Sequence, residues 1–361
     1  MKILVVYATA GAGHKKAAEA LHQGLLEVGF QDAVYLDVLD YTNRFYKNLY
    51  SRLYAFLITR VPGLWGFSFW IVDIPLLQPL IRFLRRLHNT VHAGRFHRYL
   101  IQQQFDVIFS THFFPNEVAG YLKITGRISS RIICAVTDFD VHRIWLTPGV
   151  DVYTVASDWT RKKIVSLGID ASRVVVSGIP VLAKFTEVKD PAALKQKLSL
   201  DASAFTLLLA TGSFGIGPIE AIIEQMQGFQ VLVVCGHNRG LYERLLRGGK
   251  SLVKIYGLVD NMDELMAVAD VMITKPGGLS ISEALVSALP LIFFNAIPGQ
   301  ESHNVAVLKE HDIGYEPCRI EDMRVILTTL RDSPEAYQTA RQKTRVLARP
   351  QAVKEIIDLI R

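Results

Sequence analysis

Short apolar runs rich in Val, Ile and Leu recur along the chain, and segments with helical spacing separate them. This alternation is typical of parallel sheets that are covered by helices. The runs fall into two series. The strands expected in the first series are Ile3–Ala8, Val34–Val38, Asp106–Ser110, Ile132–Val136, Val152–Ala156 and Val174–Ser177. Those expected in the second series are Phe205–Ala210, Gln230–Cys235, Leu252–Tyr256, Val271–Thr274 and Leu291–Phe294. The pattern therefore predicts an α/β protein with two parallel sheets.

Two series of strands in 361 residues favour two domains, because a single hydrophobic core stops growing at about 250 to 300 residues. The simplest architecture is a pair of Rossmann-like halves that face one another. The segment Gly178–Pro191 contains two prolines and several charges without a clear period, so it is the expected linker. We place the N-terminal domain at residues 1–180 and the C-terminal domain at residues 181–361, with the last helix packing back on the N-terminal domain.

The segment Phe45–Phe83 breaks this rhythm, because it is crowded with aromatic and leucine side chains and shows no strand–helix alternation. Its part Val61–Ile81 is nearly long enough to span a bilayer. Three prolines and one aspartate interrupt that part, however, and prolines break the interior of a helix. A transmembrane helix is therefore not expected.

Composition and charge are those of a globular protein with an anionic partner. Half of the residues are hydrophobic and 20% are charged, so large cores are easily buried and long disorder is not expected. The net charge of +6 is concentrated in residues 41–105, where nine Lys or Arg residues stand against one acid. Cys134 and Cys235 lie in apolar runs and are expected to be reduced core thiols. No cleavable export signal follows Met1, which favours the cytoplasm.

A glycine loop, Thr9–His14, follows the first expected strand and precedes a helix that is expected to start near Lys15. Its glycines let the backbone approach a phosphate, a pyrophosphate or a sugar closely. The dinucleotide fingerprint needs a third glycine where this chain has Lys16, so NAD binding is not favoured. His14 stands at the start of the helix, where the positive end of the dipole lowers the pKa of an imidazole and favours a neutral base.

A second polar cluster, Val136–Trp145, directly follows an apolar strand, which is where active sites of such sheets gather. Asp138 could orient His14 or an acceptor hydroxyl. Asp138 and Asp140 together spell a short acid-x-acid pattern that two-carboxylate metal sites also use. The pattern is short enough to arise by chance, and helix dipoles can neutralise a diphosphate without a cation, so no metal is expected.

The second half of the chain repeats the arrangement of strand, glycine turn and helix. Thr211–Gly217 is a phosphate-type loop after its first strand, and Cys235–Asn238 ends the next strand. The most specific segment is Thr274–Ala284, whose backbone amides and helix dipole suit a diphosphate and whose Glu283 suits the hydroxyls of a ribose. Pro298–Asn304 follows the last strand, with amide and carboxylate groups suited to sugar hydroxyls.

Together these motifs resemble those of the bacterial diacylglycerol glucosyltransferases and the plant monogalactosyldiacylglycerol synthases, over most of the chain. The motifs that carry the resemblance are Gly11–His14, Val136–Phe139 with His142 and Trp145, Ser177–Val181, Val234–Asn238, Ile273–Gly278, and Pro298–Glu301 with Asn304. The resemblance implies a GT-B fold, with the acceptor on the N-terminal domain and a UDP-sugar co-substrate on the C-terminal domain. It also implies inversion at the anomeric carbon without a metal or another cofactor. Ala12 interrupts the glycine triplet that the plant proteins have before the loop histidine.

The resemblance further implies roles for individual residues. His14 and Asp138 would be the catalytic base and its partner, and the sequence leaves open which of them takes the proton. Glu283 would hold the ribose, and Gly277, Gly278 and Ser280 the diphosphate. The residues expected to bind the donor are Gly13, Gly212, Ser213, Asn238, Gly277, Gly278, Ser280, Glu283, Gln300, Glu301 and Asn304.

The basic, aromatic segment of residues 41–105 has the composition of an interfacial membrane anchor that anionic lipid would attract. The residues expected to contact the acceptor or the membrane are His142, Trp145, Trp65, Trp70, Arg82, Arg85 and Arg86. The predicted function is transfer of a hexose from UDP-glucose or UDP-galactose to diacylglycerol, or to a glycosyl-diacylglycerol, at the inner face of the cell membrane. No nucleic-acid partner is expected.

Three alternatives stay open on the same fold. The first is a transferase that adds N-acetylglucosamine to a polyprenyl-linked peptidoglycan precursor. The second is a UDP-sugar epimerase, which would not need the basic, aromatic segment. The third is a non-catalytic nucleotide-sugar sensor, which His14 and Asp138 make less favoured.

Overall fold

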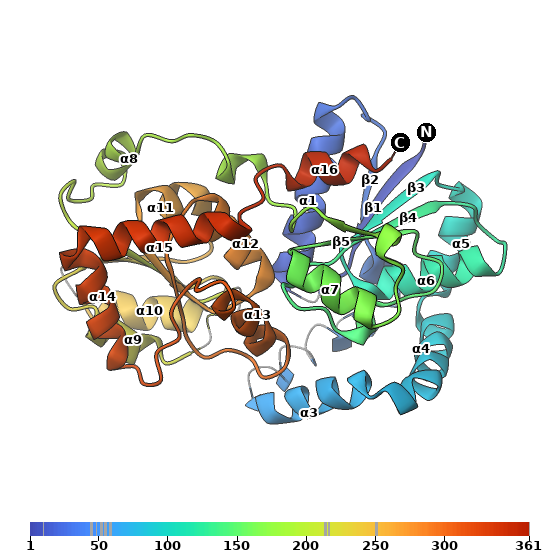
Figure 1. The fold of residues 1–361 in the computed structure, drawn as a ribbon, viewed down its shortest axis with the longest axis horizontal. Helices are drawn as coiled ribbons and strands as arrows, with labels where there is room; N and C mark the ends of the chain where they lie inside the picture. The colour runs from blue at the N-terminus through green and yellow to red at the C-terminus, as the bar shows by residue number, and fades with distance from the viewer. Residues whose placement is uncertain are drawn as a thin grey trace. The chain divides into compact units, whose positions relative to one another are not determined.

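The computed structural model describes residues 1–361 except residues 10, 44–45, 48, 51–52, 54–55, 58–59, 213–214, 216, 250–251 and 361. The chain divides into two compact units (Figure 1). The first unit comprises Met1–Leu182, Ile297–His303 and Arg349–Arg361, and the second comprises Ala183–Ala296 and Asn304–Ala348. The break after Leu182 falls inside the expected linker.

The first unit contains a six-stranded parallel sheet with the order β2-β1-β3-β4-β5-β6. Its strands are β1 (Ile3–Tyr7), β2 (Val34–Asp37), β3 (Val107–Ser110), β4 (Arg131–Ala135), β5 (Val152–Val155) and β6 (Val174–Val176). Its helices are α1 (Ala12–Glu27), α3 (Pro62–Asp73), α4 (Gln78–His92), α5 (Gly94–Gln103), α6 (Phe113–Ile124), α7 (Asp158–Ser166) and α16 (Ala352–Asp358). Short 3-10 turns are η1 (Val38–Tyr41), η2 (Pro75–Leu77), η3 (Arg143–Trp145) and η4 (Ala171–Arg173).

The strands of this sheet are buried on both faces, which explains why they read as continuous apolar runs. Along β1, Leu4 and Val6 belong to the core that includes Phe96 and Leu122 of α5 and α6, whereas Ile3 and Val5 belong to the core beneath α1 and α16. This alternation follows from the two-residue period of a strand. The sheet is therefore sandwiched between two layers of helices (Figure 1).

The C-terminal helix α16 packs against α1. Gly24 of α1 permits the close approach, because a Cβ at this position would meet the side chains of Val353 and Ile357. Ile356 is fully buried in the core on this face of the sheet. The end of the chain is thus an integral part of the first unit.

The second unit contains a five-stranded parallel sheet with the order β11-β10-β7-β8-β9. Its strands are β7 (Thr206–Ala210), β8 (Gln230–Val234), β9 (Val253–Tyr256), β10 (Val271–Thr274) and β11 (Leu291–Phe293). Its helices are α8 (Pro191–Lys197), α9 (Ile219–Gln225), α10 (Arg239–Arg247), α11 (Met262–Val268), α12 (Gly278–Val286), α14 (Asp322–Asp332) and α15 (Pro334–Leu347), with the 3-10 turn η5 (Ala183–Phe185). Every strand expected from the sequence is present, within a residue at either end.

Helix α13 (Gln300–Lys309) begins in the first unit and continues in the second. The sequence placed all of Pro298–Asn304 in the C-terminal domain, whereas the structure groups Ile297–His303 with the first unit. Close packing on α3 explains the difference. A Cβ on Gly66 would lie 2.9 Å from the Pro298 Cβ, and a Cβ on Gly299 would lie 2.8 Å from the Phe69 ring.

The aromatic segment that broke the rhythm of the sequence forms helices where it is described. Pro62, Pro75 and Pro79 all stand in first turns, of α3, η2 and α4, where a missing N–H costs nothing. Among the described residues, no single helix has the length and apolarity to cross a bilayer, and the pair Gly63–Asp73 and Pro75–His92 passes only jointly, with a bend of 73°. The prolines therefore mark helix starts.

Candidate active site

The carboxyl ends of β1, β3 and β4 lie side by side at one edge of the first sheet. The chain passes from β1 to β2 on one side, while β3 pairs with β1 on the other, so the strand order reverses here. Ligands of open α/β sheets bind at such a reversal. His14 follows β1, Thr111 and His112 follow β3, and Thr137 and Asp138 follow β4.

The imidazole of His14 is held by its Nδ1 atom. Nδ1 lies 2.8 Å from the Thr111 carbonyl oxygen and 2.9 Å from the Thr137 Oγ1. A carbonyl oxygen only accepts, so Nδ1 carries the hydrogen and Nε2 keeps a lone pair. The Thr111 hydroxyl donates in turn to the His14 carbonyl oxygen, at 2.8 Å, which ties the first turn of α1 to the end of β3.

Burial lowers the pKa of His14 to about 4, although the hydrogen bond to the Thr111 carbonyl acts in the opposite direction. Helix α1 begins at Ala12, three residues earlier than expected, so His14 stands in its first turn. The positive end of the helix dipole there also favours the neutral ring. At neutral pH the side chain is therefore in the form that can accept a proton.

Asp138 is buried in the same pocket, and both of its carboxylate oxygens accept hydrogen bonds from Gln300 Nε2, at 3.2 and 3.1 Å. Gln300 was expected to bind the donor sugar, and the structure places it beside Asp138 and His14. The pocket encloses about 660 Å³, including space open to solvent. A neutral base, a carboxylate and an amide therefore line one cavity.

The carboxylate of Asp140 binds two neighbouring side chains and so fixes the loop after β4 that also carries Asp138. Its carboxylate lies 2.5 Å from Lys163 Nζ and 3.1 Å from His303 Nδ1. Burial alone would raise the pKa of Asp140, but the hydrogen bonds from His303 and Lys163 outweigh burial and keep that pKa below its usual value. Within the described part of the chain, no three His, Cys, Asp or Glu side chains are grouped as metal ligands would be.

Apolar and aromatic side chains complete the pocket. His142 donates from Nε2 to the Phe69 carbonyl oxygen at 2.9 Å and accepts the Ile144 N–H at Nδ1, so its ring is fixed against α3. Trp145 is buried with its ring 5.9 Å from that of His14. Trp65 also lines the pocket. Three of the residues expected to contact the acceptor therefore surround the candidate base.

Sequence reasoning missed His112, Phe69 and His303. The ring of His112 meets that of His14 edge-on, with centroids 4.6 Å apart. Burial, together with the neighbouring His14 and Arg85, holds the pKa of His112 well below its usual value. A histidine directly after an apolar strand, at the same edge as the other motifs, was the available signal. Phe69 offered no such signal, since nothing in its local sequence places α3 over the pocket.

Arg85, which was expected to contact the acceptor or the membrane, is engaged by neighbours within the first unit. Its guanidinium lies 2.7 Å from Glu117 and donates to the Ile144 carbonyl oxygen at 3.1 Å. It therefore braces α4 against α6 inside the unit. Arg82 and Arg86 are exposed on the same helix, as is Trp70 on α3.

The second unit presents the expected glycine turn between β10 and α12. The strand order reverses between β10 and β7, so the turns after these two strands flank a second reversal point. Gly277 is the N-cap residue of α12, and Gly278 and Ser280 lie in the first turn of this helix. Asn304 is fully buried and donates to the Pro276 carbonyl oxygen at 3.0 Å, so it shapes this turn. The amides at the start of α12 suit an anion.

The other residues expected to bind the donor are divided between the two units. Asn238 caps α10 and donates to the Gly215 carbonyl oxygen at 3.0 Å, which links the turns after β7 and β8. Gly212 adopts a positive φ of 72° in the turn after β7, whereas Ser213 lies outside the described residues. Glu283 is buried on α12. In the first unit, Glu301 accepts from the Ile297 N–H at 2.8 Å and so shapes the start of α13, and Gly13 lies next to His14 in the first turn of α1.

Two parallel-sheet α/β units, each with glycine turns at its reversal point, define a glycosyltransferase-type GT-B fold. Solved structures with this fold include Acinetobacter baumannii MurG, with a TM-score of 0.62 at 15% identity over 99% of this chain and 98% of the other. They also include the UDP-GlcNAc 2-epimerase from Neisseria meningitidis bound to UDP-GlcNAc, with a TM-score of 0.64 at 13% identity over 99% of each chain.

The sequence comparison narrows the class. A family model described as monogalactosyldiacylglycerol (MGDG) synthase matches residues 14–181, and one described as glycosyltransferase family 28 C-terminal domain matches residues 217–316. A Bacillus cereus protein named processive diacylglycerol beta-glucosyltransferase is 30% identical over 314 residues, which cover 84% of this chain and 78% of the relative. The chain belongs to the MGDG synthase family of glycosyltransferases, and the resemblance stated from its motifs is confirmed.

Proposed function

We propose that this enzyme transfers a hexose from UDP-glucose or UDP-galactose to diacylglycerol, or to a glycosyl-diacylglycerol, with inversion and at the inner face of the cell membrane. The observation that carries the proposal is the neutral His14 imidazole, held by its Nδ1 atom in a pocket with aromatic walls. The name of the Bacillus cereus relative supports diacylglycerol as the acceptor. UDP-GlcNAc bound to the structurally similar epimerase supports a UDP-linked donor.

In the proposed mechanism His14 acts as the general base. The acceptor hydroxyl oxygen forms a bond to the anomeric carbon while its proton passes to Nε2 of His14. The bond from the anomeric carbon to the diphosphate breaks, and UDP leaves with both electrons. Asp138 lines the same pocket and its negative charge favours the imidazolium that results. Amides at the start of α12 would stabilise the leaving diphosphate.

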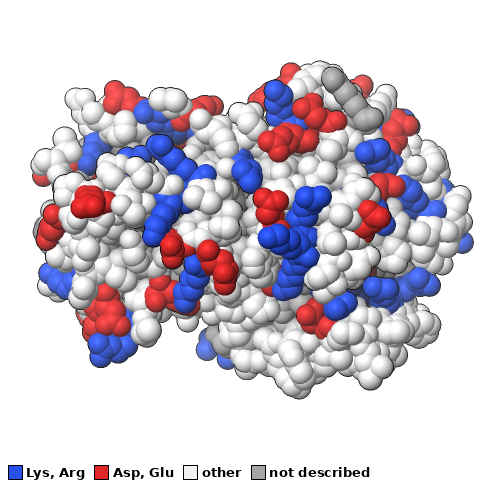
Figure 2. Space-filling model, in the orientation of Figure 1, with Lys and Arg blue, Asp and Glu red and all other residues white. Residues whose placement is uncertain are grey.

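The acceptor is proposed to reach the pocket from a membrane on which α3, η2 and α4 dock. We call their exposed apolar side chains the docking face. It consists of Leu64, Phe67, Trp70, Leu76, Leu80, Phe83, Leu84, Leu87 and Val91. In Figure 2 the surface over α3 and α4 is a broad uncharged patch. Large contiguous apolar patches are rare on monomeric proteins, and where they occur they mark membrane or protein contacts.

Position and charge favour a membrane over a protein partner. On α4 the apolar residues recur every three or four positions, which gives a helix that lies flat in an interface. Arg82 and Arg86 on the same helix add positive charge, worth about 1 kcal/mol each near an anionic surface. Trp65 and Phe69 of α3 also line the His14 pocket, so one helix contributes to both the docking face and the proposed acceptor site.

The test is to supply the purified protein with UDP-glucose and with UDP-galactose, each with vesicles that contain diacylglycerol, and to resolve the lipid products by mass. A hexosyl-diacylglycerol from either donor supports the proposal and identifies the sugar. Turnover only of UDP-GlcNAc with a polyprenyl-linked acceptor would replace it with the peptidoglycan alternative. Isomerisation of a UDP-sugar in the absence of any acceptor would replace it with the epimerase alternative.

A further inference from the structure

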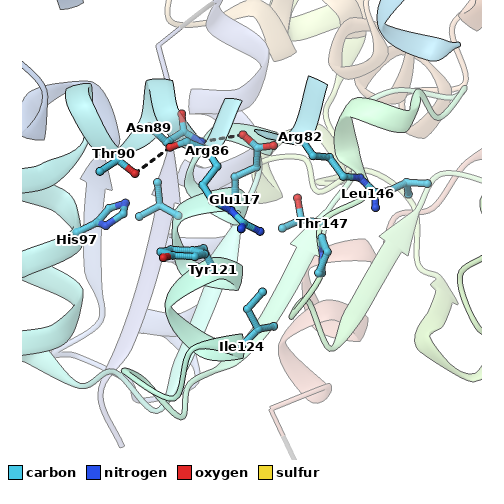
Figure 3. Close-up of a pocket in the computed structure, with 12 residues that line it drawn as sticks. Arg82, Arg86, Asn89, Thr90, His97, Glu117, Tyr121, Ile124, Leu146 and Thr147 are labelled. Carbon is cyan, nitrogen blue, oxygen red and sulfur yellow. Dashed lines mark hydrogen bonds between the residues drawn. The ribbon is translucent and has the colours of Figure 1, made fainter. Parts of the chain in front are cut away.

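The first unit contains a second cavity, bounded by α4, α5, α6 and the segment Leu146–Pro148 (Figure 3). It encloses about 540 Å³, including space open to solvent. None of its lining residues lines the His14 pocket. The proposed transfer reaction does not use it.

The cavity carries positive charge that the described part of the chain does not neutralise. Arg82 and Arg86 both line it, and neither forms an ion pair with a described carboxylate. Among the described residues of the lining, Glu117 is the one acidic residue, and it is already engaged by Arg85 at 2.7 Å and by Asn89 at 2.8 Å. The two exposed guanidinium groups therefore give the cavity a positive charge, which suits an anion.

Two hydrogen-bonding groups on residues of the lining lack a partner among the described protein residues. The Thr147 hydroxyl is on a residue that is only 6% exposed, and its Oγ1 makes no hydrogen bond to any described protein atom. His97 Nε2 is also buried without one. Burial, aided by Arg127, lowers the pKa of His97, so the neutral ring has one N–H to donate. Buried polar groups are nearly always satisfied, so an unpartnered hydroxyl on a residue that lines a cavity marks a place where a ligand or an ordered water would bond.

Arg82 and Arg86 line the same cavity as Thr147. The Arg86 guanidinium lies over the Tyr121 ring, 4.9 Å from its centroid, which fixes its direction. In the view of Figure 3, Thr147 is drawn between the ends of Arg86 and Arg82. Guanidinium, hydroxyl and imidazole N–H groups are all donors, and a tetrahedral oxyanion accepts several donors at once.

We propose that this cavity binds the oxyanion of a phosphate ester, held by Arg82, Arg86 and Thr147. The ester is either the headgroup of an anionic phospholipid in the docked membrane or a soluble phosphate ester. The lipid source rests on the proposed membrane docking, whereas the phosphate chemistry does not. On α4, Arg82 and Arg86 alternate with Phe83 and Leu87 of the docking face, so a lipid beside the helix would bring its phosphate near the cavity.

The first experiment uses no membrane. The phosphorus resonance of glycerol 3-phosphate is followed by NMR as the full-length protein is added, with inorganic phosphate as a second probe. The Arg82→Gln/Arg86→Gln variant should weaken binding by about tenfold or more, because two charge-assisted contacts are lost. Thr147→Val keeps the branched shape and removes one hydrogen bond, so it should weaken binding by about fivefold.

The matched control is Arg95→Gln/Arg98→Gln, which removes the same charge from exposed positions of α5 that do not line the cavity. It should leave binding of glycerol 3-phosphate within about twofold of the unchanged protein. Equal losses in both double variants, or no loss with Thr147→Val, would show general charge attraction and would overturn the site.

The second experiment distinguishes the two sources of phosphate. Flotation is compared on vesicles of phosphatidylcholine alone and on vesicles that also contain phosphatidylglycerol. With a lipid ligand, Arg82→Gln/Arg86→Gln should abolish the preference for phosphatidylglycerol while binding to phosphatidylcholine persists. Binding of glycerol 3-phosphate without any preference for phosphatidylglycerol assigns the site to a soluble ester. Failure to float on either vesicle would count against the proposed membrane docking and leave the solution measurement to decide the phosphate site.

Discussion

The protonation state of a single histidine is what gives the candidate site its chemistry. Nδ1 of His14 is hydrogen-bonded by the Thr111 carbonyl and the Thr137 hydroxyl, and burial keeps the ring neutral. The sequence predicted a neutral base from the helix dipole alone. The structure adds burial as a cause of the low pKa of His14 and identifies Nε2 as the atom that has the lone pair.

Replacing His14 tests the base directly. We expect His14→Ala to lower kcat by about 10²- to 10⁴-fold, which is the usual contribution of a general base. Binding of UDP, measured by calorimetry, should be unchanged, because the glycine turns that we propose to bind the donor belong to the other unit. His22→Ala, on the same helix, is the control and should retain activity. Full activity of His14→Ala would eliminate His14 as the base.

The low pKa of His14 predicts the pH dependence of the reaction. The ring must be neutral to accept a proton, so activity should hold as the pH falls until it approaches about 4. A base with the ordinary histidine pKa of about 6.5 would lose about tenfold in kcat/KM by pH 5.5. We expect less than about a twofold change between pH 8 and pH 5.5. A loss centred near pH 6.5 would mean that the ring is more hydrated than the structure shows.

At the scale of elements, the two sides of α4 differ in their surroundings. One side carries Leu80, Phe83, Leu84, Leu87 and Val91 of the docking face. The other is fixed to α6 through the ion pair of Arg85 with Glu117. From the sequence, this region was described only as a basic, aromatic segment. The two sides of α4 could not be told apart, because the helix boundaries around the prolines were not expected. Once Gln78 is known to begin the helix, the spacing alone assigns the sides.

A change to the docking face should separate membrane binding from catalysis. Phe83→Ser/Leu87→Ser removes two exposed apolar side chains and should weaken flotation with vesicles by about tenfold or more, since each is worth about 1.5 to 3 kcal/mol when fully buried. Turnover of acceptor presented in detergent should change much less.

The control for this variant removes exposed apolar side chains from the other unit. Leu246→Ser/Val325→Ser alters residues that are as exposed as those of the docking face. It should leave flotation unchanged. Equal losses in the two variants would show that general surface hydrophobicity, rather than the docking face, drives binding.

At the scale of the whole molecule, the two units are not two consecutive halves of the chain. The first unit takes residues from three stretches, including the C-terminal helix α16 and the start of α13. Ile356 and Ile357 of α16 complete the core beneath α1. Stability of the candidate active site therefore depends on the last residues of the chain as well as the first.

A cavity in that core should reveal this dependence. Ile356→Ala deletes a fully buried side chain and should lower the free energy of unfolding by about 2 to 5 kcal/mol. The loss should appear as a lower Tm for the first unit by calorimetry. Lys354→Ala, on the exposed side of the same helix, should change the Tm little. Equal stability of the two variants would mean that α16 is not part of the core in solution.

The sequence by itself determined every strand, both glycine turns and most of the polar residues at the sheet edges, because hydrophobic period and turn chemistry are local properties. The sequence also supported assignment to the family, since short motifs with a fixed spacing can be recognised along the chain. The partners of those residues depended on strand order. Placing β3 next to β1 brings Thr111 and His112 to His14, and neighbours across a sheet cannot be read from a linear pattern.

Only tertiary packing placed Gln300 beside Asp138, set Phe69 over the pocket and turned Arg85 inward, because each contact joins segments far apart in the chain. Burial likewise follows from packing. The pKa of His14 and the unpartnered hydroxyl of Thr147 were therefore decided by the structure alone.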